Sequence, residues 1–247
     1  MNLIVVRPQD IEGNGMVILR DAHARHAIDV LKVVPGKTVR VGVLNGPFGV
    51  GTVTAVHSDA VSMHCVFEAK APEKPRLDLL LALPRPKVLR RLWAQLAALG
   101  VGRIVLTNAA RVERNYFDTH VLEPEFYRPL LVEGLQQARD THLPRVSIHR
   151  RFRPLVEDEL DVLSPDAARV VAHPAADAAP IAGAWPHGAR RVLLAVGPEG
   201  GWDDFELRLL IARGFRPASL GTRTLRTDTA CVALLAALRA GRALPSS

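Results

Sequence analysis

Cysteine is scarce in this sequence, with Cys65 and Cys231 the only two among 247 residues. They lie far apart and in no zinc-binding spacing, which argues against a structural metal site and a disulfide framework. Long apolar runs are also missing, because arginine recurs at short intervals and no stretch approaches the ~18 residues of a membrane span. The opening residues 1–8 are too short and too soon interrupted to form a signal peptide. We therefore expect a cytoplasmic protein that contacts no membrane and binds no metal.

The common catalytic motifs are missing as well. The chain contains no Walker A sequence, no G-x-G-x-x-G, no G-x-S-x-G and no H-E-x-x-H. These absences weaken an ATPase, a nicotinamide-dependent enzyme, an α/β-hydrolase and a zinc protease as interpretations. What remains is chemistry that needs neither a metal nor a protein nucleophile.

Aromatic residues make up only 5% of the chain, whereas apolar residues make up 48%, so the core must consist mainly of Leu, Val and Ala. The net charge is +7, and nearly all of the 32 basic residues are arginine. The planar guanidinium suits bidentate phosphate contacts, which makes nucleic acid the first partner to consider. A genome biased towards Arg and Ala codons would give the same composition, so composition alone leaves both explanations open.

The first 70 residues follow a β-type pattern. Residues 38–43, 50–56 and 61–66 alternate apolar and polar positions with period two and are separated by turn sequences. This spacing predicts a small antiparallel barrel or sandwich, with a helix over residues 23–33 ended by Pro35-Gly36. Residues 69–76 are charged and interrupted by proline, which is typical of an interdomain linker. We therefore expect one domain over residues 1–70 and another over residues 76–247.

The second part of the chain alternates short apolar runs with helical periodicity. The runs 77–83, 103–107, 169–172, 192–196 and 216–220 are expected as strands, and residues 88–96, 126–138 and 227–239 as helices. This alternation indicates an α/β domain with a parallel sheet covered on both faces. The Ala-rich stretch 175–184 is expected to be a surface connection.

Two loops after expected strands are candidates for a ligand site, because ligands collect at the carboxyl ends of parallel strands. Gly197-Pro198-Glu199-Gly200-Gly201 lets the backbone approach a ligand closely, and Asp203 with Glu206 forms a capping box for the next helix. The alternative is an ordinary tight turn. Residues 220–229 form a second, dense polar loop, for which the alternative is a solvated loop whose Thr227 caps a helix. His173 follows a third strand, where a lone histidine is more often structural than catalytic.

The two loops together resemble the RsmE family of ribosomal RNA methyltransferases, which belongs to the SPOUT superfamily. The resemblance rests on Gly-Pro-Glu-Gly-Gly at 197–201 and Leu-Gly-x-Arg-x-Leu-Arg-Thr-x-Thr-Ala at 220–230. It implies a PUA-like β-barrel domain that binds RNA, followed by a SPOUT α/β domain with a trefoil knot, in a homodimer. Periodicity could not have predicted the knot, because knots are rare exceptions to topological rules. The implied activity is methylation of N3 of a uridine in small-subunit ribosomal RNA, with S-adenosyl-L-methionine as the donor.

The resemblance also assigns site residues. The residues that it implies for cofactor binding are Ala172, His173, Val196, Gly197, Pro198, Glu199, Gly200, Gly201, Ser219, Leu220, Gly221, Arg223 and Leu225. Arg226 would lie next to the transferred methyl group and stabilise negative charge on the uracil oxygens. Glu199 or Asp228 would accept the N3 proton, and no spacing argument chooses between them.

Clusters of arginine predict where RNA binds. The candidates are Arg7, Arg20, Arg25, Arg150, Arg151 and Arg153, although a run of charges is usually only a solvated face. The cofactor motifs are intact, but the chain departs from the family pattern at residues 94–101 and 136–140. Two alternatives therefore stay open: a methyltransferase acting on another RNA base or a ribose, and a non-catalytic RNA-binding ribosome assembly factor.

Overall fold

The structure is a computed structural model that describes residues 3–174 and 178–243. Two compact units divide the chain: unit 1 holds the residues up to 74 together with 132–143, and unit 2 holds 75–131 and the residues from 144 onwards. The segment 132–143 packs with the N-terminal residues, since Leu3 N donates to Gln136 O (3.1 Å) and Asn45 N donates to Thr141 O (2.7 Å). None of the described helices is long and apolar enough to span a membrane.

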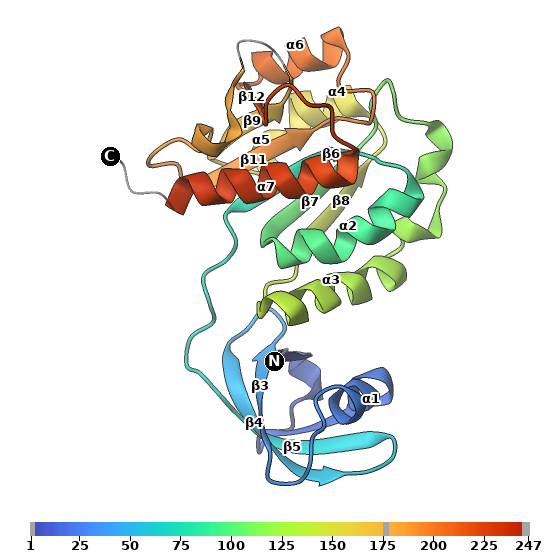
Figure 1. Cartoon of the computed structure of the whole chain (residues 1–247), viewed down its shortest axis with the longest axis vertical. Coiled ribbons are helices and arrows are strands. Elements are labelled where there is room, and N and C mark those ends of the chain that lie inside the picture. Colours follow the sequence, from blue (N-terminus) through green and yellow to red (C-terminus); the bar gives the residue numbers. More distant parts are fainter. Residues whose placement is uncertain (1–2, 175–177, 244–247) are drawn as a thin grey trace. The chain divides into compact units, whose positions relative to one another are not determined.

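Unit 1 is built on a curled five-stranded sheet in the order β1-β3-β4-β5-β2 (Figure 1). The period-two pattern is confirmed, because Met63 and Cys65 of β5 are buried whereas His64 between them is exposed. The sheet is an open half-barrel with β1 and β2 at its ends, and β1 pairs with β3 in parallel, which the predicted antiparallel barrel did not include. Its elements are β1 (Ile4–Val6), η1 (Pro8–Asp10), β2 (Met16–Arg20), α1 (Asp21–Asp29), β3 (Thr38–Val43), β4 (Phe48–Val56) and β5 (Ala60–Phe67).

Unit 2 contains a seven-stranded sheet in the order β10-β12-β9-β11-β6-β7-β8, and every pair in it is parallel. This confirms the α/β class expected from the alternation of apolar runs and helices. The strands are β6 (Leu77–Ala82), β7 (Val101–Thr107), β8 (Arg145–His149), β9 (Ala167–Ala172), β10 (Ala179–Pro180), β11 (Arg191–Val196) and β12 (Arg216–Ser219). β8 was not predicted, because its half-exposed residues lack an apolar run.

The helices of unit 2 connect these strands (Figure 1). They are α2 (Pro86–Ala98), η2 (Arg114–Phe117), η3 (His120–Leu122), α3 (Pro124–Ala138, which ends in unit 1), α4 (Phe152–Pro154), η4 (Leu155–Glu159), α5 (Leu160–Leu163), η5 (Ile181–Gly183), α6 (Asp204–Ala212) and α7 (Thr227–Ala243). Of the Ala-rich stretch 175–184, residues 175–177 lie outside the described residues, while β10 and η5 account for most of the rest. Ile181 is buried there, so the stretch is not only a surface connection.

Helix α7 packs against α2 within unit 2. Its large apolar residues Leu234, Leu235 and Leu238 are buried, whereas Ala236 and Ala240 are exposed. Residues 230–238 are apolar on every side of this helix, a pattern that is typical of a helix buried on all faces. In the structure the chain itself covers the face with these leucines, and the exposed positions at this end of α7 are Ala236, Arg239 and Ala240.

One charged residue lies inside the apolar run 77–83. Asp78 is fully buried in β6, where its carboxylate accepts from Arg191 Nη1 (2.8 and 2.9 Å) and from Ser164 Oγ (2.6 Å). A buried carboxylate is tolerated only when it is paired and hydrogen-bonded. These contacts tie β6 to β11 and to the end of α5 at the amino ends of the strands, away from the loops described next.

Candidate active site

A cavity of about 330 Å³ lies where β9, β11 and β12 end. Its size falls in the range of small-molecule sites. Every residue predicted to bind a cofactor lines this cavity, so the structure brings both glycine loops and His173 together. The sequence missed Pro174, Trp202, Ala218, Thr224, Thr227, Ala230 and Leu234, which also line it. Thr227, Ala230 and Leu234 recur at helical spacing in α7, and that signal could have identified one face of this helix as a wall of the site.

The first glycine loop is held in a defined turn. Gly201 N donates to Pro198 O (2.8 Å), and Gly201 has a φ of +74°, a left-handed conformation that favours glycine. Trp202 packs against Gly197, because a Cβ on Gly197 would lie 3.1 Å from the Trp202 backbone nitrogen and 3.2 Å from its indole. The loop therefore needs glycine for its own packing as well as for access by a ligand.

The expected capping box of α6 is confirmed and has a further contact. Asp203 Oδ1 accepts from Glu206 N (2.7 Å), and Glu206 Oε2 accepts from Asp203 N (2.9 Å). The other carboxylate oxygen of Glu206, which is buried, accepts from Ala110 N (2.6 Å) in the loop after β7. Glu206 thus ties the start of α6 to a neighbouring strand end.

Two arginines from neighbouring strand ends contact the same glycine loop. Arg85, which follows β6, places Nε 3.2 Å from Glu199 Oε2, and both side chains are largely exposed. Arg111, which follows β7, donates from Nη1 to the Gly200 carbonyl. Neither residue was a sequence candidate, because the loops after β6 and β7 were not considered. The rule that ligands gather at the carboxyl ends of parallel strands applies equally to β6 and β7.

The second loop is more open. Ser219 Oγ accepts from Gly221 N (3.0 Å) and donates to Gly221 O (3.0 Å), and Gly221 has a φ of +109°. Arg226 is exposed, and it is absent from the residues that line the cavity although Leu225 and Thr227 line it. Within residues 3–174 and 178–243 no hydrogen bond or ion pair engages its side chain.

Asp228 is paired with Arg91 of α2 rather than with Arg226. Arg91 Nη2 lies 2.5 Å from Asp228 Oδ2. The hydrogen bond from Arg91 holds the pKa of Asp228 below its usual value, and this effect exceeds the opposing effect of burial. The carboxylate of Asp228 is therefore a weaker base than an ordinary aspartate.

Some of the arginines predicted to bind RNA already form an ion pair within the protein, and others do not. Arg7 pairs with Asp10 (2.9 Å) in unit 1, where Arg20 and Arg25 are exposed. In unit 2, Arg150 pairs with Asp118 (3.1 Å) and Arg153 with Glu157 (3.0 Å), while Arg151 is exposed. No group of His, Cys, Asp or Glu among the described residues could hold a metal ion.

The parallel sheet and the cavity at its strand ends define an α/β domain with a site for a small molecule, and comparison identifies its family. The family described as RNA methyltransferase domain matches residues 72–239, so the chain belongs to this family. Ribosomal RNA small subunit methyltransferase E of Treponema pallidum is 28% identical over 97% of this chain and 91% of its own length. Ribosomal RNA small subunit methyltransferase E 1 of Borreliella burgdorferi is 24% identical over 94% of this chain and 95% of its own. These relatives confirm the resemblance to the RsmE family.

A solved structure extends the comparison to the fold. Ribosomal RNA small subunit methyltransferase E of Neisseria gonorrhoeae, bound to S-adenosyl methionine, matches with a TM-score of 0.76. The two sequences are 18% identical, and the match covers 97% of each chain. At that identity the likeness concerns the fold, and it extends over both units.

Proposed function

We propose that this protein transfers a methyl group from S-adenosyl-L-methionine to N3 of a uridine in small-subunit ribosomal RNA. One observation carries the proposal: both glycine loops of the RsmE pattern line a single cavity of about 330 Å³ at the strand ends. Full-length relatives named ribosomal RNA small subunit methyltransferase E support the substrate. A ribosomal RNA substrate also favours a cytoplasmic location.

The residues present fit the cofactor. Gly197, Gly200, Gly201 and Gly221 carry no side chain that would keep a ligand from the backbone, and Pro198, Ala218 and Leu234 supply apolar walls. Such a lining suits a ligand that combines an adenine ring with polar ribose and amino-acid ends. When bound, S-adenosylmethionine supplies an electrophilic methyl group. Alignment of the donor and the acceptor then provides much of the rate.

We assign two roles to side chains at the site. Arg226 stabilises the negative charge that develops on the uracil oxygens as the N3 proton leaves. Glu199 accepts that proton, and it is preferred over Asp228 because the Arg91 hydrogen bond lowers the pKa of Asp228. Arg85 beside Glu199 (3.2 Å) would have to release this carboxylate or share it while the proton is transferred.

Unit 1 is proposed to be the PUA-like RNA-binding domain, with Arg7, Arg20 and Arg25 on its surface. Its curled sheet and exposed arginines are consistent with that role. For unit 2 we propose the trefoil knot of SPOUT enzymes between β11 and α7. In support, β9 lies between β11 and β12 in the sheet, yet the loops that follow these two strands line the same cavity.

We propose a homodimer, as in the family. The support within this chain is the exposed row of small residues on α7, such as Ala236 and Ala240, which would allow another helix to approach closely. Light scattering at micromolar concentration should give twice the chain mass of 26.9 kDa. A mass of a single chain would refute the dimer.

The central experiment maps the modified nucleotide. Small-subunit ribosomal RNA is incubated with the protein and S-adenosylmethionine carrying a labelled methyl group, digested, and analysed by mass spectrometry. The expected product is 3-methyluridine at one position. Label on another base or on a ribose would support a different RNA methyltransferase. No label, with RNA binding intact, would support an assembly factor.

A further inference from the structure

The loop after β7 contacts the first glycine loop and the helix α6 that follows it, through two successive residues. The backbone nitrogen of Ala110 donates to Glu206 Oε1 (2.6 Å), and the side chain of Arg111 donates to the Gly200 carbonyl. These contacts come from residues that neither sequence motif contains. They connect the proposed cofactor loop to a strand that contributes nothing to the lining of the cavity.

The aliphatic part of the Arg111 side chain also lies against Gly200. A Cβ added to Gly200 would lie 2.8 Å from Arg111 Cδ and 3.7 Å from Arg111 Cβ. A Cβ on the next residue, Gly201, would lie 3.9 Å from Arg111 Nη1. The arginine therefore runs along two successive glycines and holds one of their carbonyl groups.

The loop that carries Arg111 is itself held by hydrogen bonds. Asn108 N donates to His149 O (3.2 Å), and Val112 N donates to Ala109 O (3.0 Å), so the loop closes in a hydrogen-bonded turn. Ala109 and Val112 are buried. Arg111 thus extends from an anchored turn.

Glycines without a restraint lose the most conformational freedom when a ligand orders them, and that loss weakens binding. We propose that Arg111 is a positioning residue that holds the Gly200–Gly201 turn in the shape that receives S-adenosylmethionine. This inference rests on the proposed function. Arg85 is a weaker candidate for the same task, because it contacts only the exposed side chain of Glu199 and exposed pairs of this kind contribute little.

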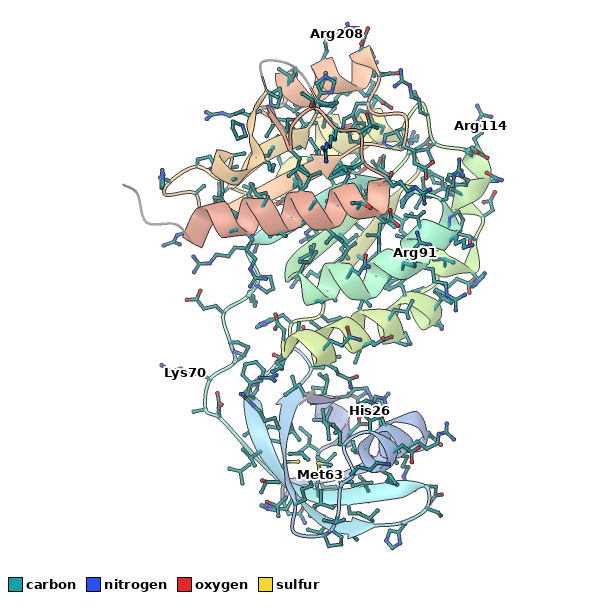
Figure 2. All side chains as sticks on the ribbon, in the orientation of Figure 1. His26, Met63, Lys70, Arg91, Arg114 and Arg208 are labelled. Carbon is teal, nitrogen blue, oxygen red and sulfur yellow. The ribbon has the colours of Figure 1, made fainter. Side chains whose placement is uncertain are left out.

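The test measures cofactor affinity by calorimetry on the full-length protein. Arg111→Ala should weaken S-adenosylmethionine binding by roughly tenfold to a hundredfold, the scale of one hydrogen bond from a charged donor. The KM for the cofactor should rise in parallel, while kcat at saturating cofactor and the KM for RNA stay within about threefold of wild type. Arg114→Ala is the matched control, because Arg114 is an exposed arginine three positions on that projects into solvent (Figure 2).

A second pair of variants tests the contact without removing the arginine. Gly200→Ala should weaken cofactor binding by about tenfold, because its new Cβ displaces Arg111. The same change in an Arg111→Ala background should add little, since the nearest remaining atom of residue 111 lies 3.7 Å away. Gly183→Ala is the control, because a Cβ there meets nothing within 4 Å. This design stays informative even if Arg111→Ala is unstable, which circular dichroism would reveal.

The outcomes separate this inference from the proposed function. If the wild-type protein does not bind S-adenosylmethionine, the proposed function fails first. If the wild type binds it and Arg111→Ala binds it as tightly as Arg114→Ala does, Arg111 has no positioning role. An equal effect of Gly200→Ala in both backgrounds would also overturn the inference, because the alanine would then act on the cofactor directly.

Discussion

At the scale of single residues, the arginines around the candidate site differ in whether they contact another protein group. Arg85, Arg91 and Arg111 each engage a group in one of the two motif loops. Arg226 engages no side chain or backbone group among the described residues. Next to it, α7 begins at Thr227 with a helix N-terminus that favours negative charge. Arg226 is therefore available to a substrate, as is Arg223 in the cavity lining, which also has no hydrogen bond or ion pair among the described residues.

We predict that Arg226→Ala leaves cofactor affinity within a few-fold of wild type and lowers kcat by roughly 10²-fold or more, the scale for losing one charge-stabilising donor. The reason is that a guanidinium stabilises a deprotonated uracil and is not needed to hold a cationic sulfonium. Calorimetry and single-turnover methylation measure the two quantities separately. A variant that folds normally and methylates at the wild-type rate would falsify the catalytic role of Arg226.

The two thiols should be inert in the native protein. Burial raises the pKa of Cys65 to about 11, and burial, with a smaller contribution from Asp228, raises that of Cys231 to about 12. Because only the thiolate reacts, both groups stay neutral and unreactive between pH 6 and about 9. Ellman's reagent at pH 8 should therefore titrate no thiol in the folded protein and two per chain in denaturant. Rapid reaction of either thiol in the folded state would contradict this.

At the scale of elements, the sequence predicted the helices and strands whose pattern depends on residues close together in the chain. The capping box of α6 and the period-two strands of unit 1 are confirmed, because each depends on residues a few positions apart. β8 escaped prediction, since its residues lie at the edge of the sheet and are only partly buried. Asp78 in a central strand is explained by Arg191 and Ser164, which are both distant in sequence. The contact between Arg111 and Gly200 was not predicted either, because these residues are also distant in sequence.

The segment after β8 bears on RNA binding. A triple variant with Ala at Arg150, Arg151 and Arg153 should bind RNA more weakly. The slope of its log affinity against log salt concentration should fall by about one unit per lost phosphate contact. Among the single variants, Arg151→Ala should weaken RNA binding most. Arg150 and Arg153 must first break their ion pairs with Asp118 and Glu157 before they can contact RNA. Filter binding at several salt concentrations measures both quantities. Arg208→Ala, an exposed arginine on α6 (Figure 2), controls for net charge. Unchanged affinity and slope would remove this segment from the interface.

At the scale of the whole molecule, the two units should respond differently to the cofactor. The cavity is lined only by residues of unit 2. A ligand that binds the folded state at a hundred times its Kd stabilises it by about 2.7 kcal/mol, which corresponds to a rise in Tm of roughly 5–10 °C for a chain of this size. We predict such a rise with S-adenosylmethionine, together with slower hydrogen exchange in residues 197–201 and 219–225. Protection of unit 1 alone would show that the cofactor binds elsewhere.

The position of the cavity along the chain has a consequence for the order of events during synthesis. Its walls come from the ends of β9, β11 and β12 and from α7, so its last contributions follow residue 215 of 247. Long-range contacts of this kind form late in folding, after the intervening chain has been ordered. Unit 1 draws mainly on the first 74 residues and can be ordered much earlier. A nascent chain would therefore carry an ordered sheet with exposed arginines well before it gains a place for the methyl donor.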